Sequence, residues 1–275
     1  MRASTPPPLL FALFAVLATA ACGGDDAGTD TDATTDSATS SGSDTADTAD
    51  TGTDTDAEAE PELAVVVIGD LAGDDLAASQ VAHDMVAMGG EDQAKMAGDF
   101  GHDAMLGTTL LGTTENEFLA IDRWSSDDNI DAFYGDPNFQ MAFGALFEAP
   151  PAPSMYIYQD TWAHWGELTS GDAATPHFFV VVRGRLASAD SDANKALHDM
   201  IAEGGKEMVM AAGDVAHVPF TGRADPQEFL NIDIWTSADN IEAVYTNPDF
   251  IAAFGQLFEA PPQVGVYQST DWHQW

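Results

Sequence analysis

One long pattern of residues occurs twice in the chain, and this repeat limits the possible folds more than any other feature. A His-Asp-Met triplet at 83–85 recurs at 198–200, an offset of 115 positions. After a four-residue deletion the stretch 117–124 recurs at 228–235, and the six residues at 146–151 recur unchanged at 257–262. Collinear identity of this kind predicts a tandem pair of domains with one fold. We place them at 62–166 and 177–275.

The order of elements within one copy follows from hydrophobic periodicity. The Val run at 65–67 predicts a buried strand, and 75–97 predicts a helix that we expect to bend or break at Gly89-Gly90. Strands are expected over 102–111 and 117–124.

A second helix should follow the third strand. We expect Ser125 and Asp128 to cap its start, Pro137 to restart it, and a last strand to lie near 155–158. The fold class is therefore α+β, with two ferredoxin-like β-α-β-β-α-β units whose helices cover one face of an antiparallel sheet.

The face of each sheet that no helix covers needs a partner. Two such sheets packed face to face would close a barrel, and the second copy can supply the partner within the chain. We therefore expect an intramolecular barrel and no requirement for a second subunit, so a monomer would suffice.

Several motifs resemble the dimeric α/β-barrel superfamily, and within it the antibiotic-biosynthesis monooxygenase type. They are His-Asp-Met at 83–85, Gly-Asp-x-x-His at 98–102, Phe-Leu-x-Ile-Asp-x-Trp at 118–124 and the Pro-Pro pair at 150–151, each with its counterpart in the second copy. The resemblance implies a ligand pocket between the helices and the sheet of each unit. Its members include cofactor-independent monooxygenases, haem-degrading enzymes and proteins of no known function.

The polar residues that could face such a pocket are the candidates for chemistry. Histidine is the side chain best suited to remove a proton near neutral pH. The catalytic candidates are His83, His102, His198 and His217. The candidates for substrate binding are Asp122, Trp124, Asn129, Asp233, Trp235 and Asn240. Each also has an ordinary structural interpretation, as a hydrogen-bonded histidine or carboxylate, a core tryptophan, or a polar start of a helix.

Two functions remain open from the sequence. One is a cofactor-independent, monooxygenase-like activity on a small aromatic or polyketide-like compound. The other is a non-enzymatic envelope protein that binds a hydrophobic small molecule or another envelope protein. The histidine spacing matches no metal-ligand pattern, so we expect neither metal nor cofactor. Because the copies differ at Arg123 and Ile234, one pocket could be functional and the other mainly scaffold.

The residues before the repeat indicate export and anchoring. Residues 1–21 combine Arg2 with an apolar run too short to span a bilayer comfortably, which is typical of a signal peptide. The sequence around Cys22, the only cysteine, resembles a bacterial lipoprotein signal, although Thr19 replaces the usual aliphatic residue. That resemblance implies a lipid on Cys22 and a cell-envelope location outside the cytoplasm. Gly23 favours the outer membrane, and ordinary secretion with a free thiol is the alternative.

A highly acidic segment separates this signal from the repeat. Between 23 and 60 there are twelve acidic residues and no Lys or Arg, among Thr, Ser, Ala and Gly, so residues 22–61 are predicted to be a disordered, extended tether. The whole chain carries 46 acidic and 8 basic residues, a net charge of -38. Such a charge argues against nucleic acid as a partner.

Overall fold

The computed structural model describes residues 62–169, 171–172 and 175–275. The predicted signal peptide, Cys22 and the acidic tether therefore lie outside the described residues. None of the helices in the described part is long and apolar enough to cross a membrane.

The same order of elements occurs in two halves of the described chain. The first half contains β1 (Leu63–Asp70), α1 (Leu76–Ala97), β2 (Asp99–Gly107), η1 (Leu110–Gly112), β3 (Glu117–Trp124), α2 (Ile130–Tyr134), α3 (Pro137–Gly144) and β4 (Ser154–Tyr158). The second half contains β7 (Phe178–Arg185), α4 (Ser191–Ala212), β8 (Asp214–Gly222), β9 (Glu228–Trp235), α5 (Ile241–Tyr245), α6 (Pro248–Phe254), η2 (Gly255–Leu257) and β10 (Gln263–Ser269). A short hairpin of β5 (Gly171–Asp172) and β6 (Thr175–Pro176) lies between them.

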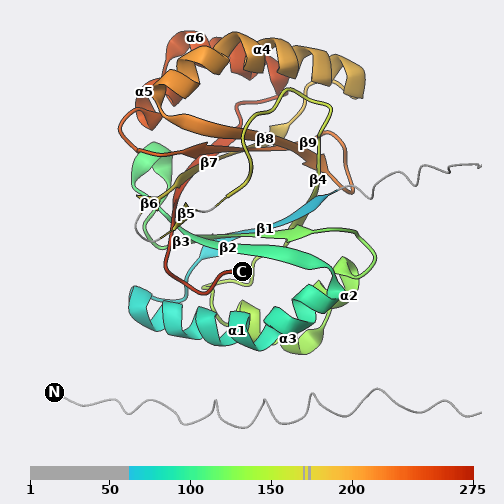
Figure 1. The fold of residues 1–275 in the computed structure, drawn as a ribbon, viewed down its shortest axis with the longest axis vertical. Helices are drawn as coiled ribbons and strands as arrows, with labels where there is room; N and C mark the ends of the chain where they lie inside the picture. Colours follow the sequence, from blue (N-terminus) through green and yellow to red (C-terminus); the bar gives the residue numbers. More distant parts are fainter. Residues whose placement is uncertain (1–61, 170, 173–174) are drawn as a thin grey trace, which may run out of the picture. The chain divides into compact units, whose positions relative to one another are not determined.

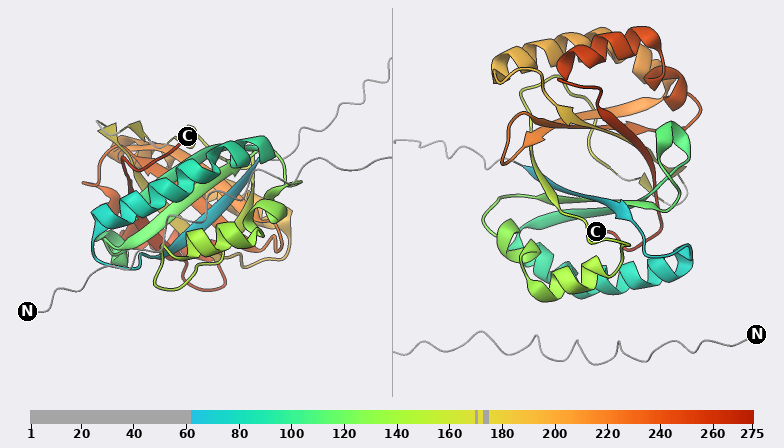
Figure 2. Two further views of the ribbon diagram at one scale, coloured as in Figure 1. Left: turned by 90° about the horizontal axis from the view of Figure 1, so that it is seen from below. Right: turned by 180° about the vertical axis from the view of Figure 1, so that it is seen from behind.

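Eight strands close into one barrel in the order β1-β3-β2-β10-β7-β9-β8-β4. Helices α1 and α3 cover the barrel on one side, and α4 and α6 cover it on the opposite side (Figures 1 and 2). The sequence predicted this closed α+β barrel. It did not predict that the last strand of each half crosses over, with β4 pairing with both β1 and β8, and β10 pairing with both β7 and β2.

Alternation along the strands divides the apolar residues between the barrel interior and the clusters beneath the helices of each half. On β3, Leu119 and Ile121 point into the barrel, where they meet Leu230 and Ile232 of β9. Phe118 of the same strand faces the helices with the aromatic residues beneath them. Asp122 lies an even number of residues from Phe118, so it also points to the helical side.

Two local predictions about the helices are wrong. Helix α1 continues through Gly89-Gly90 to Ala97 without a break, because tertiary packing on the sheet outweighs the weak helix propensity of glycine. Ser125 does not cap the next helix; its hydroxyl donates to the carbonyl of Gly98. The predicted restart is present, with Asp136 capping α3 at Pro137.

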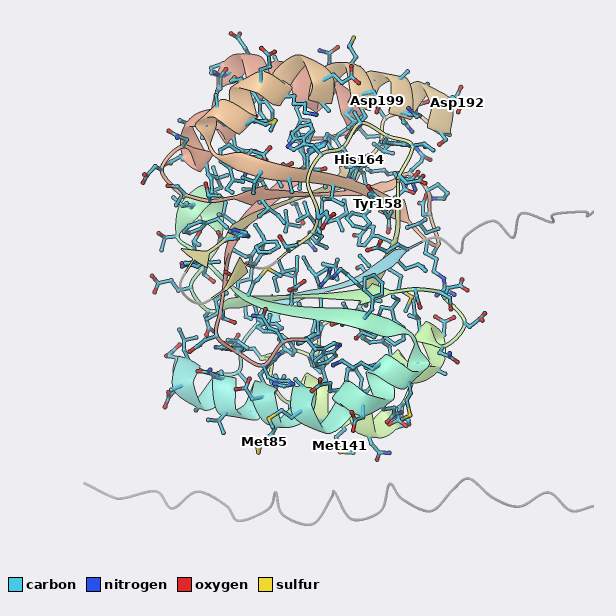
Figure 3. The ribbon with its side chains drawn as sticks, viewed as in Figure 1. Met85, Met141, Tyr158, His164, Asp192 and Asp199 are labelled. Atoms are coloured by element: carbon cyan, nitrogen blue, oxygen red, sulfur yellow. The ribbon has the colours of Figure 1, made fainter. Side chains whose placement is uncertain are left out.

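The segment that follows each crossing strand reaches over the opposite half. Residues 159–165, after β4, lie against the second half, and residues 270–275, after β10, lie against the first. The backbones of Trp165 and His217 exchange two hydrogen bonds, and those of Trp275 and His102 do the same. In Figure 3 His164 lies on the first of these crossing segments, close below α4. Each half is thus completed by residues of the other.

Candidate functional site

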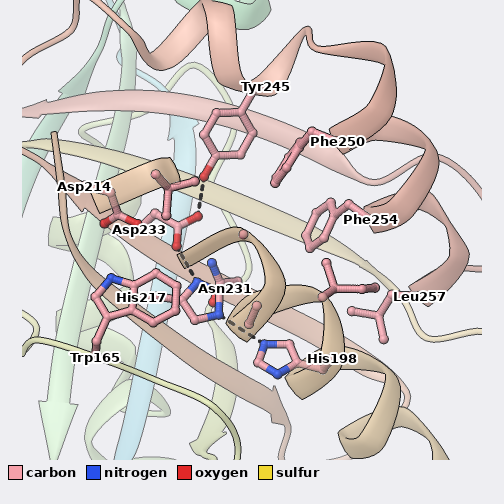
Figure 4. A pocket seen from close by; sticks show the side chains of 14 residues that line it. Trp165, His198, Asp214, His217, Asn231, Asp233, Tyr245, Phe250, Phe254 and Leu257 are labelled. Carbon is pink, nitrogen blue, oxygen red and sulfur yellow. Dashed lines mark hydrogen bonds and ion pairs between the residues drawn. The ribbon is translucent and has the colours of Figure 1, made fainter. Parts of the chain in front are cut away.

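A chain of hydrogen-bonded side chains runs beneath the helices of the second half (Figure 4). The Nε2 atoms of His198, on α4, and His217, on β8, lie 3.2 Å apart. The Nδ1 atom of His217 lies 2.6 Å from Oδ1 of Asp233, and the hydroxyl of Tyr245 donates to the other oxygen of that carboxylate. We call these four side chains the second relay.

The first half contains the same arrangement from equivalent residues. His83 and His102 approach through their Nε2 atoms at 3.2 Å, His102 bonds Asp122 through Nδ1, and Tyr134 donates to the same carboxylate. We call this set the first relay. The exposed fraction is 2% for His83 and 7% for His102, so water can reach this pair only poorly.

A further carboxylate, next to the helix histidine of each relay, also holds a crossing segment. Nδ1 of His198 lies 3.1 Å from Oδ1 of Asp199, which also accepts the amide N–H of Ala163 at 2.6 Å. In the first half Asp84 is 3.1 Å from His83 and accepts the amide of His273. The Asp of the His-Asp-Met motif therefore links a relay to the segment that covers it.

Counting protons assigns a charge to each histidine pair. Both Nδ1 atoms face carboxylates, so both must carry a proton if those carboxylates are ionised. The two Nε2 atoms would then present lone pairs to each other at 3.2 Å unless one of them also carries a proton. Each pair consequently holds one extra proton and one positive charge between two carboxylates.

The electrostatics of the pairs agree with this assignment. Burial, followed by the charge on His102, lowers the pKa of His83 to about 4, and burial with the charge on His217 does the same for His198. Burial acts to lower the pKa of His102, but the charge and hydrogen bond of Asp122 outweigh it and raise that pKa. The helix histidine is therefore neutral in both pairs, and in the first pair the charged imidazole is the strand histidine, His102.

A second carboxyl group lies beside each relay at the start of a strand. Burial and the charge of Asp122 raise the pKa of Asp99 to about 7, and burial and the charge of Asp233 raise the pKa of Asp214 to about 9. The positive charges of His102 and Arg123 limit the rise at Asp99. At neutral pH Asp214 is accordingly a buried, protonated acid.

Indole rings from the crossing segments cover the histidines. Trp165 stacks on His217 with ring centroids 4.5 Å apart, and Trp275 stacks on His102 at 4.6 Å. Trp162 and Trp272 lie against the helix histidines, at 5.0 and 5.1 Å. Each pocket therefore has a wall of flat aromatic surface supplied by the opposite half.

Each relay lines an apolar pocket between helices and sheet. The second pocket has an empty volume of about 490 Å³, which includes its opening to solvent. It is lined by Trp165, His198, Ile201, Ala202, Gly205, Val209, Asp214, His217, Asn231, Asp233, Tyr245, Phe250, Phe254 and Leu257. The first pocket, of about 460 Å³, is lined by His83, Val86, Ala87, Gly90, Ala94, Asp99, His102, Ala120, Asp122, Phe133, Tyr134, Phe139, Phe143 and Trp275.

One glycine in the middle of each long helix, α1 and α4, lines a pocket. Gly90 and Gly205 occupy equivalent positions and both face a pocket. A Cβ atom placed on either would meet no atom within 4 Å. The absence of a side chain there leaves the pocket open, at a cost of about 1 kcal/mol of helix stability per glycine.

Not all of the predicted site residues line a pocket. The four histidines with Asp122 and Asp233 do. Trp124 and Trp235 are buried packing residues outside the pocket walls. Asn129 and Asn240 are exposed and donate to the carbonyls of Ala97 and Ala212, so they tie helices together away from the pockets.

Arg123 also lies away from the pocket that it was expected to distinguish. It points to the barrel side of β3, 3.7 Å from the carboxylate of Asp103, and donates to the carbonyl of Leu168. Val218 and Ile234 occupy the equivalent positions in the second half. The difference therefore exchanges an ion pair for an apolar pair inside the barrel.

Sequence reasoning missed four kinds of site residue. Tyr134 and Tyr245, with Asp99 and Asp214, recur in both copies, and this recurrence was the signal that could have identified them. The crossing tryptophans also recur, but nothing local shows that they reach the other half. Asn231 does not recur, because the equivalent residue of the first copy is Ala120, so only a difference between the copies could have identified it. Among the described residues no group of three or more His, Cys, Asp or Glu could hold a metal ion.

Comparison with known proteins shows the fold. No protein-family model matches the chain, and no curated protein matches its sequence. A protein from Fusobacterium nucleatum, provisionally described as a monooxygenase, has a similar structure with a TM-score of 0.53 and 10% identity, over 78% of this chain and 94% of that one. An anthrone oxidase-like protein matches with a TM-score of 0.54 and 14% identity, over 78% and 93%. The chain therefore shares the α+β barrel fold of these monooxygenase-like proteins.

Proposed function

We propose that the pockets bind a small aromatic or polyketide-like compound and that the relay accepts a proton from it in a cofactor-independent, monooxygenase-like reaction. The observation that carries the proposal is a continuous His-His-Asp-Tyr chain inside an apolar pocket with a flat aromatic wall. A neutral imidazole beside a charged one suits this task, since the first can accept a proton and the second can stabilise the resulting anion.

The chemistry requires only substrate and oxygen. An activated CH₂ group flanked by aromatic rings loses one proton to give an enolate. The enolate carbon forms a bond to O₂, and the peroxide takes up a proton. Cleavage of the O–O bond with loss of the remaining C–H proton leaves a ketone and one water. The substrate supplies all of the electrons, so no reductant is needed. In this reaction the Nε2 atom of His198 or His83 is the proposed proton acceptor, once the substrate replaces the neighbouring imidazole as its partner.

Binding without turnover is the second candidate, and a specific observation favours it. Both nitrogens of His198 are already engaged, and Trp162 and Trp165 lie against the histidine pair. A pocket of this kind can hold a hydrophobic small molecule while its relay stays intact.

Oxygen uptake with 1,8-dihydroxyanthrone distinguishes the two candidates. The purified chain should consume oxygen above the uncatalysed rate, and combining His83→Ala with His198→Ala should reduce that excess by at least about 100-fold. The matched control combines Asn129→Ala with Asn240→Ala, which lie outside the pockets, and should keep the activity. An unchanged rate in the double histidine variant would remove the proposed base. Saturable binding with no excess uptake in the unmodified protein would support the binding function.

We further propose that the two halves are a tandem duplicate carried by an exported lipoprotein. The signal-like residues 1–21, Cys22 and the acidic segment to residue 61 support this location. Labelling of growing cells with a fatty-acid analogue should mark the protein, and Cys22→Ser should abolish the label. A label that persists in this variant would contradict attachment at Cys22.

A further inference from the structure

Asn231 is a buried amide that the chain leaves without partners. It lies on β9 with an exposed fraction of 1%, and its side chain faces the second pocket beside His198 and His217 (Figure 4). Neither Oδ1 nor Nδ2 has a hydrogen-bond partner in the described part of the chain. Buried amides nearly always have partners, because an unmet donor or acceptor is costly. This one offers both a donor and an acceptor to whatever occupies the pocket.

The first pocket lacks this group at the equivalent position. Ala120 stands there on β3, also nearly fully buried and also facing its pocket. Most of the other wall positions correspond and carry similar residues, such as Val86 and Ile201 or Ala94 and Val209. Asn231 for Ala120 is the one exchange of a polar for an apolar residue among the corresponding wall positions. The two pockets therefore share a relay and differ in what they can recognise.

The surroundings of Asn231 restrict the ligand further. Phe250, Phe254 and Leu257 form the apolar side of the second pocket, and Asp214 and Asp233 contribute the nearby carboxyl groups. A carboxylate ligand would place a further negative charge in this acid-lined pocket, in a chain whose net charge is -38. A neutral ring bearing a hydroxyl or carbonyl oxygen meets the amide without that repulsion.

We propose that the second pocket is the ligand site and that it selects a neutral, planar phenol or aryl ketone, whose oxygen bonds the amide of Asn231. A carbonyl oxygen accepts from Nδ2–H, and a phenolic hydroxyl donates to Oδ1. The aromatic ring lies among the phenylalanines of α6, within reach of the second relay. The first pocket, with Ala120, offers no such bond and serves mainly to complete the barrel. This selection deepens the proposed function and rests on the same pocket, but it concerns binding and is independent of turnover.

Calorimetric titration of the full chain with 2-naphthol tests the proposal, with 2-methylnaphthalene as a ligand of the same shape that lacks the oxygen. The unmodified protein should bind one equivalent of 2-naphthol tightly. Asn231→Ala should weaken this binding about tenfold, as expected for the loss of hydrogen bonding in a buried site, and should not weaken binding of 2-methylnaphthalene. This variant should fold, because alanine already occupies the equivalent position in the first half.

The reciprocal variant makes the test independent of any damage to the second half. Ala120→Asn should create a second site and bring the stoichiometry for 2-naphthol to two. Two equal sites in the unmodified protein, or an unchanged affinity in Asn231→Ala, would overturn the proposal. Oxygen uptake reports separately on the proposed reaction. If uptake is absent while Asn231→Ala still weakens binding, the oxygenation fails and the ligand site stands.

Discussion

The two pockets of this barrel share the same ionisable and aromatic side chains but differ at one residue of the pocket wall. Both contain a histidine pair, an aspartate, a tyrosine and a raised-pKa acid, and in both a tryptophan from the opposite half stacks on the strand histidine. They differ at one equivalent wall position, which is Asn231 in the second pocket and Ala120 in the first. A second difference, Arg123 with Asp103 against Ile234 with Val218, lies inside the barrel. The two copies of a repeated domain can therefore keep the same hydrogen-bonded relay while the ligand that each pocket recognises changes.

Removal of the relay carboxylate should give the largest effect and tests whether the relays are equivalent. Asp122→Ala and Asp233→Ala each leave a buried imidazole and a tyrosine hydroxyl without their acceptor. Each should lower the free energy of unfolding by about 3 kcal/mol, measured by urea titration. The matched variants Asp128→Ala and Asp239→Ala, at exposed positions, should change it by less than about 0.5 kcal/mol. A loss confined to one half would show that only one relay carries the charge inferred for both.

The next largest effect is on the pH dependence of the free energy of unfolding, which should differ between Asp99 and Asp214. An unfolded chain ionises these carboxyls near pH 4, whereas Asp214 stays protonated in the folded state to about pH 9 and Asp99 to about pH 7. The folded state then binds more protons, so stability falls as pH rises through each window, by up to about 1.4 kcal/mol per pH unit for each group.

Of the two acids, only Asp214 should contribute to this fall between pH 7 and 9. Asp214→Asn should therefore make the stability curve less steep in that range, while Asp99→Asn should leave the slope there nearly unchanged. Thermal unfolding of the unmodified protein and of the two variants at pH 7, 8 and 9 measures this slope. The same slope in all three would contradict the difference between the pockets.

A larger side chain at Gly205 or Gly90 should fill one pocket at a time, so that the ligand affinity of each pocket can be tested separately without damage to the fold. Gly205→Leu should lower 2-naphthol affinity at least tenfold, because its side chain enters the second pocket, while Gly90→Leu should have little effect. Both variants should keep or slightly raise the free energy of unfolding, by up to about 1 kcal/mol, because leucine is the better helix former. Calorimetry and urea unfolding check the two parts. Equal losses of affinity would place binding in both pockets.

The smallest expected effect is a gain in stability. Asn231→Ala removes two buried polar atoms that have no partner in the described chain. The free energy of unfolding of the unliganded protein should therefore rise by about 1 kcal/mol, which for a chain of this size raises the melting temperature by about 2–4 °C. Differential scanning calorimetry without ligand measures it. A clear loss of stability would mean that the amide is structural.

The sequence predicted the parts of this fold that depend on local pattern. Alternation placed Asp122 and Trp124 together on one face of β3, and Pro137 marked the restart of a helix. The break at Gly89-Gly90 was wrong because packing on the sheet holds the helix together and the glycines border a pocket. The crossing of β4 and β10, and with it Trp165 on His217, depends on pairing between distant segments. No local pattern contains that information.

The site was predictable to the same degree. The pocket implied by the resemblance, together with the chemistry of histidine, led to the four histidines, and alternation separated Asp122 and Asp233 from the apolar face of their strands. The bonds between His83 and His102 depend on a helix and a strand meeting in space, which spacing along the chain does not give. Recurrence gives no signal for Asn231, because the copies differ at that position and its importance lies in that difference.

The most direct test of unequal pockets is a crystal structure of the unmodified protein with 2-naphthol. We expect one ligand in the second pocket, with its ring against Phe250 and Phe254 and its oxygen within about 3.2 Å of the Asn231 amide. The first pocket should contain no ordered naphthol. Ligand in both pockets at equal occupancy, or in the first alone, would contradict the central claim that the barrel keeps two relays and uses one of them for recognition.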